Sequence, residues 1–500
     1  MSSRSASHAG DPGRRPRGAL TVLLLAALMG ILDVLIVNVA APSIQRDLHA
    51  SFDDIQAVIS GYVLVYAVTL TTGARLGDTY GRRRVFVLGV LGFTAFSAAC
   101  AAAPSAGVLI VLRLGQGLAA ALMLPQVLAL IQMIFPPKQR ARPLALYAAT
   151  LGLGAVLGQI IGGALLHWDV LDLGWRSVFL VNVPVGLTAA ACVPATLPRH
   201  RPSGRQRLDL PGLLLSGAAM TLLIVPLIRG GADGWPLWVW PAFAASALAL
   251  VALWQAERRE ERAGGAPLVR PSLFRSPGFR IGLAITLIFY SGNYGLFLLL
   301  AYVFQDGLRL SPLASGVAFV PLGAGFAGAS LAGRRLLARY GNRVLVVGAG
   351  TMAAGYLVLV VTLWPGPASS GPVTALVMAP ALLVAGVGQG IVSAPLIGVV
   401  LATVPEAEAG AGSGMVLTAN QLASSLGVAV LGSVFVGLLG ADPQDAGARA
   451  AGGEGFASAL VGCSWVLLAL AGGVGVLAWR LPGGGGGRGG RRVPSGADGS

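Results

Sequence analysis

Fourteen long apolar stretches dominate the sequence and leave little of it for a water-soluble fold. A membrane-spanning helix needs about 20 mainly apolar residues, and each stretch is close to that length. Of the 500 residues 55% are hydrophobic and 11% charged, whereas soluble domains carry about 25% charged residues. We therefore predict an all-α polytopic membrane protein. The expected spans are 19–41, 56–74, 84–103, 107–134, 143–166, 176–197, 210–228, 237–254, 279–304, 313–333, 344–364, 373–402, 414–440 and 457–479.

The basic residues between these spans predict which side of the membrane each loop faces. Arg and Lys concentrate on the cytoplasmic side of membrane proteins. With the N-terminus inside, 29 of the 35 basic residues fall in the tails and inner loops, and 5 fall in outer loops. We therefore expect a multi-pass protein of the cell membrane with both termini in the cytoplasm. Because topology explains the net charge of +15, no nucleic-acid partner is expected.

Two short motifs recur eight spans apart. Tyr80-Gly81-Arg82-Arg83 follows the second span and Tyr340-Gly341-Asn342-Arg343 follows the tenth, while Gly115-Gln116-Gly117 in the fourth span matches Gly388-Gln389-Gly390 in the twelfth. The offset predicts two six-helix bundles of the same orientation, separated by two extra helices. Parallel repeats of this kind build many secondary transporters, with the substrate site near the midplane between the halves.

This repeat divides the chain into five expected parts. They are an N-terminal cytoplasmic tail (1–18), a first bundle (19–197), a linker with the two extra spans (198–278), a second bundle (279–480) and a Gly/Arg-rich cytoplasmic tail (481–500). No connection exceeds about two dozen residues, too few for a separate soluble domain. The function is therefore expected to lie within the membrane.

The sequence lacks the motifs of common enzymes and ATP-driven pumps. There is no GxxxxGK[ST] loop, because the single lysine, Lys138, is followed by Gln. GxSxG and HExxH are also missing. Cys100, Cys192 and Cys463 form no CxxC pair, and the four His are not clustered, which argues against disulfides and zinc. We expect a transporter with no enzymatic activity, no cofactor and no metal.

Two ionisable residues lie well inside predicted spans, where charge suggests function. Asp33 is 8 residues from the outer end of its span and Arg113 is 6 residues from the outer end of its own, which gives depths of about 12 and 9 Å. The two are therefore expected to pair. A buried carboxyl beside a guanidinium can change protonation when water reaches it, as a proton carrier requires. The alternative is a static ion pair that holds two helices together.

The loop after the second span, residues 73–84, carries an acid among bases. Positive-inside anchoring accounts for its arginines, including Arg82 and Arg83. Asp78, close to Gly81, has no such role. An acid at a helix end among bases can latch neighbouring helices in one state and release them in another, so we assign this loop to conformational gating.

A stripe of small residues runs along the fifth span. Gly154, Gly158 and Gly162 recur every four residues, which places them on one helix face. Such a stripe allows close helix packing. It would equally provide a sliding surface for conformational exchange.

Four ordered motifs resemble the major facilitator superfamily, and within it the fourteen-helix drug:proton antiporters. The resemblance covers 19–480, with Ala74 in place of a usual Gly and Gln159 in place of a usual Pro. It implies export of amphipathic, often cationic, compounds in exchange for protons. It also implies that Arg113 takes part in proton coupling and that the protein functions as a monomer. The motifs are Leu32-Asp33-Val34-Leu35-Ile36-Val37-Asn38-Val39-Ala40-Ala41-Pro42, residues 73–84, Arg113-Leu114-Gly115-Gln116-Gly117 and residues 154–163, and Trp175-Arg176 through Pro184 is also typical of the branch.

One deep acid and one deep base leave the expected cavity with little fixed charge. Specificity for a small-molecule substrate should then come from apolar surface and neutral polar groups. An importer of a small metabolite is the alternative to a drug exporter, whereas a scaffold gains little from buried charge. Polar candidates chosen by depth, each also suited to joining helices, are Tyr62, Tyr66, Gln126, Asn182, Asn293, Tyr294, Gln389, Asn420 and Gln421.

Overall fold

In the computed structural model, every regular secondary-structure element of the described residues is a helix. Residues 1–13, Lys138 and the Gly/Arg-rich tail after residue 481, for which expectations were stated, lie outside the described residues. The described residues are 14–136, 139–169, 172–198, 209–232, 235–265, 267–364, 371–405, 408–443 and 445–481.

The helices follow the predicted order along the chain. The first bundle contains α1 (Arg14–Asp47), α2 (Phe52–Tyr80), α3 (Arg82–Ala101), α4 (Ala106–Ile134), α5 (Ala141–Trp168), the short 3₁₀ turn η3 (Gly174–Arg176), α6 (Ser177–Leu180) and α7 (Asn182–Thr196). The extra helices are α8 (Leu210–Ala232) and α9 (Val239–Arg262). The second bundle contains η4 (Pro271–Arg275), α10 (Pro277–Tyr302), the π-helix η5 (Val303–Gly307), α11 (Pro312–Ala318), α12 (Val320–Tyr340), α13 (Arg343–Leu363), α14 (Pro372–Leu401), α15 (Ala409–Leu439) and α16 (Ala446–Trp479).

Thirteen helical stretches of the described chain are long and apolar enough to cross a membrane. The predicted span 143–166 is not among them, although it forms the continuous helix α5. Several helices are longer than hydropathy predicted, because a helix continues past the apolar core of the bilayer where polar residues can be hydrated. The predicted span 176–197 corresponds to the single stretch Gly174–Thr196, in which Val181, between α6 and α7, keeps helical backbone angles (φ −58°, ψ −28°).

The predicted parallel repeat is present in the helix packing. In the first half α4 packs against α2 and α3, and in the second half α14 packs against α12 and α13. A side chain at Gly117 of α4 would collide with the backbone carbonyl of Tyr62, and one at Gly390 of α14 would collide with that of Phe326. The two repeated Gly-Gln-Gly motifs therefore mark the same close helix crossing in both halves.

In both halves a glycine with positive φ ends the first helix of the crossing, although ψ differs between them (121° at Gly81 and −148° at Gly341). Gly81 ends α2 with φ 96° and Gly341 ends α12 with φ 56°. An L side chain rarely adopts a positive φ, so glycine lets the chain reverse into the next helix at both places. The sequence match Tyr-Gly has this backbone conformation as its physical cause.

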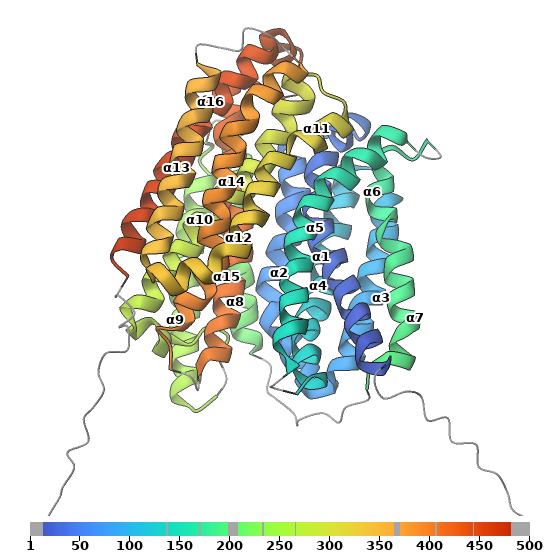
Figure 1. The fold of residues 1–500 in the computed structure, drawn as a ribbon, viewed down its shortest axis with the longest axis vertical. Helices are drawn as coiled ribbons and strands as arrows, with labels where there is room; N and C mark the ends of the chain where they lie inside the picture. Colours follow the sequence, from blue (N-terminus) through green and yellow to red (C-terminus); the bar gives the residue numbers. More distant parts are fainter. Residues whose placement is uncertain are drawn as a thin grey trace, which may run out of the picture.

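The two bundles stand side by side (Figure 1). The first described residue of α1 and the last described residue of α16 lie toward the same end of the molecule. We call this the termini end and the other the opposite end. The extra helices α8 and α9 pack against each other, and α8 also contacts α2 of the first bundle and α15 of the second. The extra pair thus covers one side of the junction between the bundles.

Candidate functional site

The expected pair of Asp33 on α1 and Arg113 on α4 forms a direct ion pair inside the first bundle. The Arg113 Nη1 atom lies 2.6 Å from the Asp33 Oδ2 atom. Asp33 is 0% exposed and Arg113 is 1% exposed, so water does not screen the two charges. The sequence therefore identified this contact correctly.

Two neutral amides complete the hydrogen bonding of the Asp33 carboxylate. The Oδ1 atom accepts from Gln116 Nε2 and from Asn182 Nδ2, each at 3.0 Å. Arg113 Nη1 also donates to Gln116 Oε1 at 2.7 Å. These donors match an ionised carboxylate, because a protonated one would need an acceptor for its own hydrogen. The pair is thus held by residues of α1, α4 and α7.

Aromatic rings cover the guanidinium of Arg113. Its carbon Cζ lies 4.2 Å from the centre of the Tyr62 ring and 5.7 Å from that of the Phe179 ring. The Nε atom donates to the backbone carbonyl of Val58, 3.4 Å away. Rings at these distances attract a cation through their quadrupole. Tyr62, expected to line the substrate cavity, is fully buried and forms part of the Arg113 pocket instead.

The helix that carries Asp33 extends past the end of the predicted span 19–41. Helix α1 continues to Asp47, so Asp33 lies 14 residues from the helix end, about 21 Å. Arg113 lies 7 residues after the start of α4 at Ala106, about 10 Å from it. The two meet because α1 extends farther toward the opposite end than α4 does.

The polar cavity candidates fall into two groups. Gln126 is fully buried and donates to the Gly73 carbonyl of α2 at 2.9 Å, and Gln389 is buried and donates to the Tyr356 hydroxyl of α13 at 3.2 Å. Both therefore join helices within one bundle. Asn182 belongs to the Asp33 pair described above.

The second group lies where the two bundles face each other. Tyr66 of α2 and Tyr294 of α10 are half-buried, and both pack with Tyr147 of α5 against the same apolar cluster. Asn293 is buried, while Asn420 and Gln421 of α15 are half-buried. The structure thus brings Tyr66 and Tyr294 together across the bundles, with Tyr147 of α5 as a neighbour that the sequence did not indicate.

Comparison with known proteins agrees with this architecture. Residues 23–428 match the family described as Major Facilitator Superfamily. This chain belongs to the Major Facilitator Superfamily. It is 41% identical over 430 residues to the "Probable actinorhodin transporter" of Streptomyces coelicolor, covering 86% of this chain and 74% of that protein. It is 38% identical over 488 residues to the "Puromycin resistance protein pur8" of Streptomyces alboniger, covering 95% and 93%.

A third relative extends the pattern beyond Streptomyces. The "Multidrug resistance protein Stp" of Mycobacterium tuberculosis is 33% identical over 425 residues, covering 83% of this chain and 75% of that protein. These relatives confirm the resemblance to the fourteen-helix drug efflux branch, so the chain is a membrane transporter and not an enzyme.

A solved structure shares the fold at low sequence identity. The bacterial homologue of the human lysosomal transporter Spinster, in an inward-facing and occupied conformation, superposes with a TM-score of 0.67 and 17% identity, covering 95% of this chain and 98% of that one. At that identity the likeness shows the fold alone. It agrees with the two-bundle architecture predicted from the repeat.

Within this superfamily fold, the 73–84 loop forms the end of α2 and the turn into α3. Asp78 and Arg82 form an ion pair of 2.6 Å across the turn at Gly81. Arg75 is buried and donates to the Pro267 carbonyl after α9 at 2.8 Å. The loop therefore touches the segment that leads from the extra helices into the second bundle, a contact that the sequence did not predict.

The glycine stripe of α5 packs against α1, the helix that carries Asp33. A side chain at Gly154 would meet Ile31, one at Gly158 would meet Leu35 at 3.2 Å, and one at Gly162 would meet Ile36 at 2.8 Å. Gln159, which replaces the usual Pro, is buried between the glycines and donates to the Leu35 carbonyl at 3.3 Å.

The opposite end of the transporter is closed by polar contacts between the bundles. Gln45 of α1 donates to Asp442, next to α15, at 2.7 Å and accepts from Tyr302 of α10 at 2.7 Å. Arg46 pairs with Asp306 at 3.2 Å. Asp306 lies two residues past the predicted span 279–304, where the π-helix η5 extends α10 and buries it. We call Gln45, Arg46, Tyr302, Asp306 and Asp442 the closing cluster.

Proposed function

We propose that this protein is a proton-coupled exporter of hydrophobic or cationic drug-like compounds that works by alternating access. The observation that carries the proposal is the buried Asp33–Arg113 pair, since a charge within a membrane protein is costly and marks a functional site. The names of the relatives concern antibiotic transport and drug resistance. They support export as the direction of transport and drug-like compounds as the substrate class.

Asp33 is proposed to carry the proton. In the state described here its three donors fit the carboxylate form. Taking up a proton removes the charge that Arg113 balances, so the contacts that join α1 to α4 and α7 weaken. Because α1 also carries Gln45 and Arg46 of the closing cluster, movement of α1 couples the protonation of Asp33 to opening of the opposite end.

We place both termini in the cytoplasm, as the distribution of basic residues indicates. The closing cluster then seals the outer side, and the structure represents an inward-facing state. Tyr66 and Tyr294 line the substrate path between the bundles, and the protein works as a monomer. The arginine-rich loop 73–84 and the glycine stripe of α5 serve the exchange between states.

An accumulation assay in cells tests this function. The protein is expressed in bacteria that lack their main efflux pumps, and ethidium and puromycin are used as probes. We expect lower accumulation than in cells with the empty vector, and we expect a protonophore to abolish the difference. Higher accumulation with the protein present would show import and overturn the proposal.

A further inference from the structure

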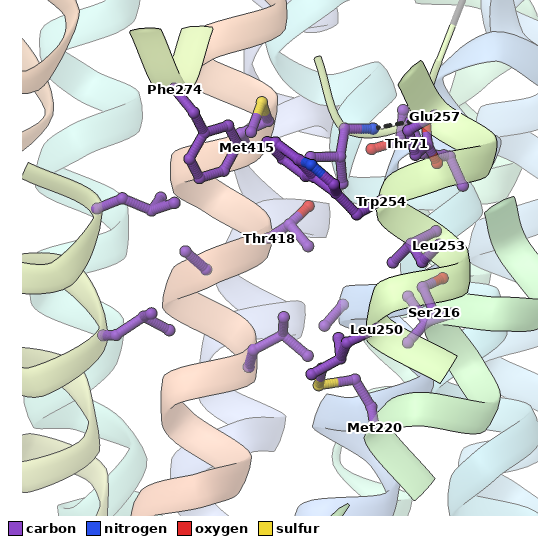
Figure 2. A pocket seen from close by; sticks show the side chains of 18 residues that line it. Thr71, Ser216, Met220, Leu250, Leu253, Trp254, Glu257, Phe274, Met415 and Thr418 are labelled. Carbon is purple, nitrogen blue, oxygen red and sulfur yellow. Dashed lines mark hydrogen bonds between the residues drawn. The ribbon is translucent and has the colours of Figure 1, made fainter. Parts of the chain in front are cut away.

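A cavity of about 370 Å³ lies between the extra helices and the two bundles. Its walls come from α2, α8, α9, α10, α15 and the segment before α10, and none of its lining residues is among the hydrogen-bond or ring partners described for Asp33 and Arg113. The volume falls within the range of small-molecule sites. Figure 2 shows Glu257, Trp254, Phe274 and Met415 around one end of this cavity and Met220 with Leu250 at the other.

The walls of this cavity are almost entirely apolar. Trp254 and Phe274 meet edge to face, with ring centres 5.2 Å apart. Met220 and Met415 add flexible thioether side chains, which adapt to ligands of different shape. The cavity thus suits a bulky apolar body.

One charged side chain interrupts the apolar wall. Glu257 lies three residues past the predicted span 237–254, and α9 continues to Arg262 and leaves Glu257 only 1% exposed. Its Oε2 atom accepts from the Val269 amide at 3.2 Å, and its Oε1 atom lies beside the carboxyl group of Asp209, with which Glu257 interacts through its side chain. Two adjacent carboxylates repel each other, so a positive group from a ligand would stabilise the pair.

Asp209 is the acidic neighbour of Glu257 at this end of the cavity, since a side chain at Gly212 would meet both Asp209 Oδ2 and Glu257 Oε1. Asp209, Glu257 and Glu260 attract the buried Arg75, and Arg270 is the base that repels it. Asp209 already accepts from the backbone amides of Gly212 at 2.8 Å and Leu268 at 3.3 Å. The adjacent carboxyl groups of Asp209 and Glu257 therefore form the acidic end of the cavity.

We propose that this cavity binds a monovalent lipophilic organic cation, with its charge beside Glu257 Oε1 and its apolar body between Trp254, Phe274 and α15. The site is separate from the Asp33 pair and needs no proton coupling to bind. It gives the two extra helices a role in ligand binding in addition to their role in covering the junction of the bundles.

The test measures how well a bound ligand protects one introduced cysteine from alkylation in the purified full-length protein. Ser216 lines the cavity, and Ser216→Cys is combined with Cys192→Ser, which removes the exposed native thiol and leaves Cys100 and Cys463 buried. The alkylation rate by N-ethylmaleimide is measured against tetraphenylphosphonium concentration. We expect saturable protection, and we expect Glu257→Gln to raise the half-protecting concentration about tenfold, or 1.4 kcal/mol.

Matched controls separate the effects of ligand charge, of cavity shape and of changes in the protein fold. Glu260→Gln, one turn farther along α9 and outside the cavity lining, and Asp33→Asn should both keep the protection. Leu250→Trp, which fills the cavity and retains Glu257, should remove it. Tetraphenylborate, of the same shape and opposite charge, should not protect.

Equal protection in Glu257→Gln and in the parent would overturn the proposal. So would equal protection by tetraphenylborate, since the cavity would then accept any apolar occupant, such as a lipid acyl chain. Neither result would affect the function proposed for Asp33, because that function is measured by transport.

Discussion

Asp33 is stabilised by protein groups in place of water. Arg113 supplies the charge, and Gln116 and Asn182 supply the remaining donors. Removing one member of a buried ion pair costs more than removing both, because the remaining charge loses its partner. A static pair and a proton carrier thus share the same geometry and differ in what happens when both charges are removed.

Arg113→Ala should destabilise the protein by about 3–5 kcal/mol, because it leaves the Asp33 carboxylate buried and uncompensated. Adding Asp33→Asn to that variant should recover much of the loss in melting temperature in detergent but should not restore energised efflux. If the double variant pumps like the parent, the pair is structural and the proton site lies elsewhere.

At this scale the sequence reveals charges better than neutral polar groups. Asp33 and Arg113 are conspicuous because charge within an apolar run is rare. Gln116 lies three residues after Arg113, on the same helix face, and that spacing was an available signal for it. Asn182 comes from a different helix and could not be paired from sequence. Glu257 was missed because hydropathy ends the span at Trp254 while the helix continues.

At the scale of helices, glycines set the distances between the elements that carry the site. Gly117 lies one residue after Gln116 and lets α4 contact the backbone of α2. Gly390 does the same for α14 against α12. The repeated motif was visible in the sequence, but its cause, contact with a backbone carbonyl, needed the structure.

Gly117→Ala and Gly390→Ala should each destabilise the protein by about 1–3 kcal/mol, since the added carbon must push two backbones apart. Gly350→Ala in α13 is the matched control, because a side chain there meets no atom within 4 Å. Thermal unfolding in detergent measures all three. Equal melting temperatures for Gly117→Ala and Gly350→Ala would show that the α2–α4 crossing relaxes freely.

At the scale of the whole molecule, the closing cluster fixes which end is sealed. Its contacts join residues as far apart in the chain as Gln45 and Asp442. The parallel repeat predicted two bundles and their orientation, because the motifs mark equivalent positions. The conformational state could not be predicted, since contacts between such distant residues leave no local pattern.

Asp442→Ala should favour opening of the closed end, because it removes the acceptor used by Gln45 and by the Phe52 amide, each at 2.7 Å. We would measure alkylation of a cysteine introduced by Ala41→Cys, a fully buried position of α1, with Cys192→Ser as background. The rate should rise several-fold. The control Asp445→Ala, at an exposed position nearby, should leave it unchanged, and an unchanged rate in Asp442→Ala would contradict a closing role.

Proton movement in inverted vesicles tests the central claim most directly. Vesicles with an acid interior receive ethidium, tetraphenylphosphonium or puromycin, and loss of the pH gradient is recorded for the parent and for Asp33→Asn, which keeps the volume and removes the titrating group. The account predicts dissipation by at least one compound with the parent and none with the variant at equal membrane levels. Equal dissipation by both proteins would contradict it.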